Sequence, residues 1–215
     1  MSDVRRMQVA GGELAYTDEG DPEDPPIVLL HGAAGSEDPW RDVRSMISPW
    51  ARVIAPQPGG DADAPPRELA DRVRDLLERL GVLRFAVAGE GAGGRVAQLL
   101  ALQGGVDALV LIGSPALDDA DDALALLQIP VIVVLGEDDP ELPATALAER
   151  LAEVLPMGSV ALLPGRGHAL FDEAPETVAP LVFQWLRSRY LKVAHSHESG
   201  PVVVELGRPT PETGT

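Results

Sequence analysis

The chain lacks cysteine altogether and contains few aromatic residues. The absence of cysteine excludes disulfides, thiol nucleophiles and thiolate-bound metals, and it fits a cytoplasmic protein, which is the location we expect. Aromatic residues make up 4% of the 215 residues, against 45% for all apolar residues, so Ala, Val, Leu and Ile have to build the core. No apolar run approaches the ~20 residues needed to cross a bilayer, and the N-terminus carries no signal-like apolar segment.

Positive charge is also scarce. The chain has 34 acidic residues against 17 Lys and Arg, which gives a formal net charge of −17. Nucleic acids and anionic membranes both require a positive surface, so we expect neither as a partner. We expect a small-molecule ligand or substrate instead, and the sequence leaves a homodimer open.

Short apolar runs bounded by glycine and proline alternate with helical patterns along most of the chain. The expected strands cover residues 4–10, 13–17, 27–30, 52–55, 84–88, 108–112, 130–135 and 159–163. The expected helices lie within 36–49, with Pro39 in the first turn, over 67–80, from the glycine turn that follows residue 88 to about 103, and over 145–155 and 175–190. This order predicts an α/β domain with a mostly parallel, doubly wound sheet of about eight strands and helices on both faces. We expect that single domain over 1–191, followed by a tail, 192–215, that is disordered or adds an edge strand.

A glycine-rich turn, FAVAGEGAGGRVA at 85–97, joins an expected strand to an expected helix. Gly89, Gly91 and Gly94 match GxGxxG, a turn that cradles a dinucleotide pyrophosphate. That interpretation requires an acidic residue at the end of the next strand to hold the ribose. The next strand ends in glycine and serine, so the dinucleotide interpretation is disfavoured.

The same turn also matches GxSxG, the nucleophile elbow, with glycine in place of serine at position 91. Three further motifs follow the order that an elbow requires. An oxyanion loop fits IVLLHGAAGS at 27–36, an acid fits VIVVLGEDDPELP at 131–143, and a late histidine fits LLPGRGHALFDEAPE at 162–176. The elbow therefore explains more of the chain than the dinucleotide turn does.

With these four motifs the sequence resembles the α/β-hydrolase fold superfamily, in the branch of small esterases, haloperoxidase-like hydrolases and epoxide hydrolases. The resemblance runs from about residue 7 to 190 and includes the loop QPGGDADAP at 57–65. Relatives often insert a helical cap before the strand that precedes the acid. Only residues 113–129 are available for it here, so we expect the cap to be absent or minimal.

The resemblance implies a site in which His168 acts as a base and Asp139 orients it. Asp138 is expected to be a solvated neighbour of that acid. Asp118 and Asp119, after the preceding strand, remain alternative acids, although their acidic surroundings favour exposure.

The resemblance also implies an oxyanion hole made by the backbone N–H groups of Ala92 and Ala33. Gly32, Ser36 and Glu90 are expected around the pocket. Glu90, one position before the elbow nucleophile, is expected to point away from the mouth of the site.

Glycine at position 91 has no side chain, so an acyl-enzyme cannot form there and the chain is not expected to act as a serine hydrolase. The sequence supports two functions. One is a non-covalent enzyme in which a His–Asp dyad activates water or drives a lyase, isomerase or cyclase reaction. The alternative is an inactive pseudoenzyme that binds a small molecule or a protein. Laboratory replacement of a natural serine stays open, and we expect neither a cofactor nor a metal.

Overall fold

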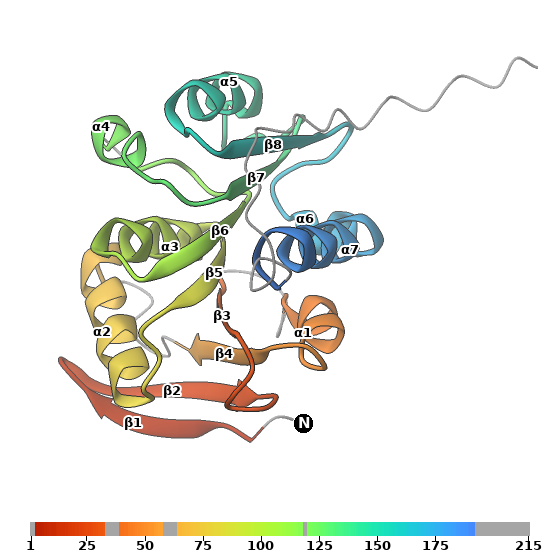
Figure 1. Ribbon diagram of the computed structural model, residues 1–215. Helices are drawn as coiled ribbons and strands as arrows, with labels where there is room; N and C mark the ends of the chain where they lie inside the picture. The colour runs from red at the N-terminus through yellow and green to blue at the C-terminus, as the bar shows by residue number, and fades with distance from the viewer. Residues whose placement is uncertain (1–2, 33–38, 58–63, 118–119, 192–215) are drawn as a thin grey trace, which may run out of the picture.

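The computed structural model describes residues 3–32, 39–57, 64–117 and 120–191. These residues contain one eight-stranded sheet with the order β1-β2-β4-β3-β5-β6-β7-β8 (Figure 1). The strands are β1 (Arg5–Val9), β2 (Gly12–Glu19), β3 (Pro26–Leu30), β4 (Arg52–Gln57), β5 (Phe85–Glu90), β6 (Val106–Ile112), β7 (Val131–Gly136) and β8 (Gly158–Leu163). The first two strands are antiparallel and the other six run parallel. The predicted fold class is confirmed, and the carboxyl ends of the parallel strands share one edge.

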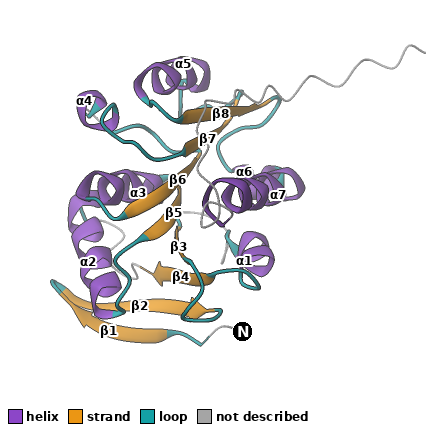
Figure 2. Cartoon of the chain, in the orientation of Figure 1, coloured by secondary structure: helices purple, strands orange, loops and turns teal. Residues whose placement is uncertain are grey.

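Helices cover both faces of the sheet, as Figure 2 shows. They are α1 (Arg41–Ile47), α2 (Pro66–Arg79), α3 (Ala92–Gln103), α4 (Asp121–Leu124), α5 (Ala144–Val154), α6 (Leu170–Glu173) and α7 (Pro175–Leu186), which continues into a π-helical turn, η2 (Arg187–Leu191). The helices α2, α3, α4 and α5 contribute to one apolar cluster, and α1, α6 and α7 to another. The sheet therefore separates two cores.

Strand β7 shows how the sequence divides its apolar residues between the two cores. Val131, Val133 and Leu135 join the α2–α5 side, whereas Ile132 and Val134 join the α1–α7 side. Successive side chains of a strand point to opposite faces, so a continuous apolar run is what a strand buried on both faces requires. The few aromatic residues include an edge-to-face contact on the α1–α7 side, where the rings of Trp40 and Phe171 have centroids 4.9 Å apart.

Some predicted boundaries are wrong. The first helix begins at Arg41, after Trp40 as its N-cap, so Pro39 precedes the helix and does not lie in its first turn. The last α-helix ends at Leu186, and the next five residues adopt the wider π-helical spacing. Helices α4 and α6 were not predicted. The expected tail, 192–215, lies outside the described residues.

The connection between β6 and β7 contains no cap domain. In its described part, the only helix is the four-residue α4. No helix in that part is long enough to cover the carboxyl edge of the sheet. Separately, no helix among the described ranges has the length and apolar character needed to cross a bilayer.

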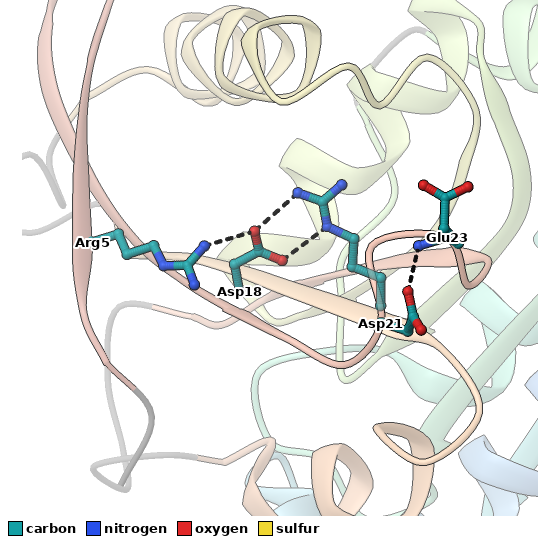
Figure 3. Close-up of polar contacts among 5 residues, drawn as sticks. Arg5, Asp18, Asp21 and Glu23 are labelled. Carbon is teal, nitrogen blue, oxygen red and sulfur yellow. Dashed lines mark hydrogen bonds and ion pairs between the residues drawn. The ribbon is translucent and has the colours of Figure 1, made fainter.

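The two antiparallel strands are joined to the parallel sheet by a half-buried group of charges. Arg52 donates from Nε and Nη2 to the two carboxylate oxygens of Asp18, at 2.9 Å each, and Arg5 donates to the same carboxylate at 3.2 Å (Figure 3). Asp18 pairs β2 with β4, so this bidentate contact holds the edge hairpin in register. The following turn is closed by Asp21, whose carboxylate accepts the backbone N–H of Glu23.

Candidate functional site

The glycine turn forms a tight junction between β5 and α3. Gly91 lies between them with φ 51° and ψ −120°, a conformation that costs most residues ~1–3 kcal/mol but costs glycine little. A Cβ atom built on Gly91 would meet nothing within 4 Å. The turn therefore has a backbone conformation that would be strained for any residue other than glycine. It also leaves open space at the position where the elbow motif has its nucleophile.

Two neighbouring glycines are small for a different reason. A Cβ on Gly93 would lie 2.5 Å from the carbonyl oxygen of Leu30, and one on Gly89 would lie 2.5 Å from the carbonyl oxygen of Gly93. Helix α3 thus starts directly against the ends of β3 and β5. These glycines serve the packing of backbone on backbone, whereas steric crowding does not explain Gly91.

His168 and Asp139 come together from the loops after β8 and β7. The distance between His168 Nδ1 and Asp139 Oδ2 is 2.9 Å, and the other carboxylate oxygen accepts the backbone N–H groups of Glu141 at 2.8 Å and Leu142 at 3.0 Å. The Asp139 side chain is fully buried, and that of His168 is 33% exposed. A carboxylate only accepts hydrogen bonds, so Nδ1 carries the hydrogen and Nε2 keeps a basic lone pair.

The histidine loop is fixed by α6. The carboxylate of Glu173 accepts the backbone N–H of Gly167 at 2.6 Å, and Arg166 donates to the Glu173 carbonyl at 2.9 Å. The Arg166 carbonyl in turn accepts the N–H of Asp138, so the two loops are also joined through backbone. The Asp138 side chain itself is exposed. Sequence analysis missed Glu173; the only available signal was an acidic pair, FDE, shortly after the histidine.

Glu90, the last residue of β5, lies mostly buried beside the turn. The pKa of its carboxyl is raised from 4.5 to about 7, chiefly by burial and also by the charge of Asp172, while His168 acts in the opposite direction. The sequence suggested that this side chain points away from the site. That orientation stays a prediction; the structure shows only that Glu90 and His168 are close enough for their charges to influence each other.

The buried Glu90 carboxyl makes stability depend on pH. Its pKa is higher in the folded chain than in the unfolded one, so the folded state binds the proton more tightly and loses stability as pH rises from about 4.5 to 7. We expect Glu90→Gln to be more stable than the unsubstituted protein at pH 8 by about 2–3 kcal/mol, and nearly equal to it at pH 4.5. Urea unfolding at several pH values measures this difference. A constant difference across that range would contradict the assignment.

The remaining predicted residues fall into two groups. Ala92 begins α3 and is exposed, and its N–H is one of the first four donors of a helix, which have no partner within it. A Cβ on Gly32 would lie 3.7 Å from the Ala92 nitrogen and 3.4 Å from the Glu90 carbonyl, so the residue after His31 adjoins the turn. Outside the described residues lie four positions that the sequence singled out: Ala33, Ser36, Asp118 and Asp119.

The site thus combines three features at the carboxyl edge of the sheet. They are a basic nitrogen on an oriented histidine, a helix N-terminus that offers N–H donors, and open space over Gly91. Such an arrangement can accept a proton and stabilise a developing negative charge. It cannot form a covalent bond to substrate at position 91. Among the described residues, no three His, Asp or Glu side chains are grouped to hold a metal ion.

Solved structures share this architecture over nearly the whole described chain. The carboxylesterase CesB from Bacillus subtilis has a TM-score of 0.77 at 18% identity, covering 87% of this chain and 92% of that one. An esterase from Thermogutta terrifontis has a TM-score of 0.73 at 19% identity, covering 88% and 100%. The sheet order, the elbow and the acid and histidine loops are those of the α/β-hydrolase fold. The chain therefore has the α/β-hydrolase fold, as its motifs predict.

Curated relatives match shorter stretches. A 2-succinyl-6-hydroxy-2,4-cyclohexadiene-1-carboxylate synthase from Klebsiella pneumoniae is 35% identical over 115 residues, which is 50% of this chain and 46% of the relative. An uncharacterised protein from Mycobacterium tuberculosis is 28% identical over 187 residues, which is 74% of this chain and 51% of the relative. The chain spans about half the length of the curated relatives it matches. No family model matches it.

Proposed function

We propose that the site performs non-covalent general-base chemistry on a small molecule. His168 takes a proton through Nε2, either from a water molecule that then attacks the substrate or from the substrate itself. The observation that carries the proposal is the 2.9 Å contact between His168 Nδ1 and a fully buried Asp139 carboxylate, beside an elbow that has no nucleophile.

The path of the proton follows from the contacts. Asp139 holds the imidazole with Nδ1–H toward itself, and as Nε2 accepts a proton the carboxylate stabilises the imidazolium that forms. The proton returns to product or to water from the same nitrogen. Negative charge that develops on a substrate oxygen over Gly91 can be met by the N–H of Ala92. Space that a serine side chain would fill is then available to the water or to the substrate.

The names of the relatives are compatible with both reactions proposed here, hydrolysis by activated water and removal of a proton from the substrate. The solved neighbours include esterases, which hydrolyse, whereas one relative is named as a synthase. We take from that name only the possibility of chemistry other than hydrolysis. Its carboxylate compound is not carried over, because most charged side chains around His168 are themselves carboxylates.

Two probes separate the two reaction types. 4-Nitrophenyl acetate reports attack by activated water, and 5-nitrobenzisoxazole reports removal of a proton from carbon. We expect turnover of at least one probe, and we expect His168→Ala to reduce it by at least ~100-fold, because general bases contribute about 10²–10⁴-fold. Initial rates at saturating and limiting probe concentrations measure kcat and kcat/KM.

Adjacent aspartates supply the matched control. Asp139→Asn should lower the rate by ~10-fold or more, whereas Asp138→Asn, which changes an exposed carboxylate, should leave it within about 2-fold. Unchanged rates in His168→Ala would refute the proposal. Absence of turnover in the folded, unsubstituted protein would instead favour the binding-module alternative.

A further inference from the structure

We propose that Glu141 determines the charge of the substrate, so that the site accepts a molecule with a cationic, ammonium-type group close to the atom that meets His168. The inference rests on the proposed role of His168 Nε2. It begins from one contact: Glu141 Oε2 lies 3.8 Å from that nitrogen. This is the nitrogen that Asp139 leaves free.

The backbone of Glu141 is fixed by the group that also fixes the histidine. Its N–H donates to Asp139 Oδ1 at 2.8 Å, while the other oxygen of the same carboxylate holds His168 Nδ1 at 2.9 Å. The neighbouring Leu142 N–H joins the same oxygen, and Pro143 caps α5 immediately afterwards. The two side chains therefore start from a shared anchor, and the position of Glu141 beside Nε2 is built into the loop.

Exposure distinguishes the two carboxylates on either side of the imidazole. The Asp139 side chain is fully buried and accepts three hydrogen bonds, whereas the Glu141 side chain is 67% exposed. Among the described residues, the one polar contact of its carboxylate is with His168. Glu141 thus lies on the solvent side of the basic nitrogen. A molecule that presents a hydrogen to Nε2 has to come within reach of this carboxylate.

Other carboxylates near His168 add to the negative charge that Glu141 brings to the site. Glu90 is mostly buried at the end of β5, beside the elbow, with Asp172 close enough to raise its pKa. The one described cation of the histidine loop, Arg166, donates to the carbonyl of Glu173. An anionic substrate at the Glu141 side of His168 would be repelled by that carboxylate, whereas a cation at ~4 Å from it would be attracted.

The experiment measures binding, so it does not require turnover. The probes are benzylamine, which is a cation near neutral pH, benzoate as the anion, and benzyl alcohol as the neutral compound of similar shape. NMR of protein labelled at histidine follows the His168 ring resonance, which is assigned by its loss in His168→Ala. We expect benzylammonium to bind at least ~10-fold more tightly than benzoate. Salt should reduce that preference, because the carboxylate is partly exposed.

Two variants test the residue. Glu141→Gln should reduce the preference for benzylammonium over benzoate to within about 2-fold, with little change for benzyl alcohol. Glu137→Gln, which changes an exposed glutamate of the same loop, should keep the preference. Benzylammonium that binds no better than benzoate, or not at all, overturns the inference, and so does a preference that survives Glu141→Gln. If the preference is present but His168→Ala leaves turnover unchanged, the proposed chemistry fails and the charge selection stands.

Discussion

Gly91→Ser is expected to form an acyl-enzyme with 4-nitrophenyl esters at position 91, where the glycine of the unsubstituted protein has no side chain to acylate. The backbone at position 91 already has φ 51° and ψ −120°, and a Cβ there meets nothing within 4 Å, so a serine side chain fits without a clash, at a cost in backbone strain of about 1–3 kcal/mol. An oriented histidine to activate it is present in the loop after β8. We expect a burst of about one 4-nitrophenolate per chain and a mass increase of one acyl group, measured by stopped-flow absorbance and intact mass spectrometry.

Two further proteins make this result specific. Gly91→Ala carries the same backbone strain without a hydroxyl and should show no burst. Gly91→Ser combined with His168→Ala should be acylated at least ~100-fold more slowly, because the serine then lacks its base. A folded Gly91→Ser variant that is never acylated would show that the histidine and the turn are not aligned for attack at this position.

Gly93→Ala is expected to lower the free energy of unfolding by about 3 kcal/mol or more, although it adds only one methyl group. The added Cβ would lie 2.5 Å from the Leu30 carbonyl oxygen and 2.8 Å from that of His31, and both oxygens belong to the main chain at the end of a central strand. Such atoms cannot turn aside as a flexible side chain can. Urea unfolding followed by circular dichroism measures the loss.

The other end of the same helix provides the control. Gly104 has φ 92°, and a Cβ there would meet nothing within 4 Å, so Gly104→Ala carries backbone strain without a clash. We expect it to cost about 1 kcal/mol. Equal losses in the two variants would mean that α3 does not approach β3 as closely as described.

The sequence predicts the sheet well because each parallel strand is buried on both faces and appears as a short apolar run. The run from Val131 to Leu135 is an example, since its residues divide between two cores without any polar interruption. Helices α4 and α6 were not predicted because each has four residues, about one turn. That is too short for the spacing of apolar residues to show a helical period. The start of the first helix is also predicted wrongly: Pro39 is compatible with a first helical turn, but the helix begins two residues later, at Arg41.

For the site, order along the chain predicts more than spacing does. An acid after β7 and a histidine after β8 reach the same edge because parallel strands end there, and this brings Asp139 to His168. The contact between Glu173 and Gly167 depends on how α6 folds back, and the contact between Glu141 and His168 depends on a turn around Asp139. Both are set by tertiary structure, and a single sequence carries no signal specific enough to predict them.

All three tryptophans belong to one side of the sheet. Trp40 and Trp185 pack in the α1–α7 core, and Trp50 lies beneath Arg187 of the π-helical turn that follows α7. Tryptophan fluorescence therefore reports on the α1–α7 layer and is insensitive to changes in the layer of α2, α3 and α5. Far-ultraviolet circular dichroism reports both layers. Comparing the two signals during unfolding would show whether the two helical layers unfold in one cooperative transition or one layer unfolds before the other.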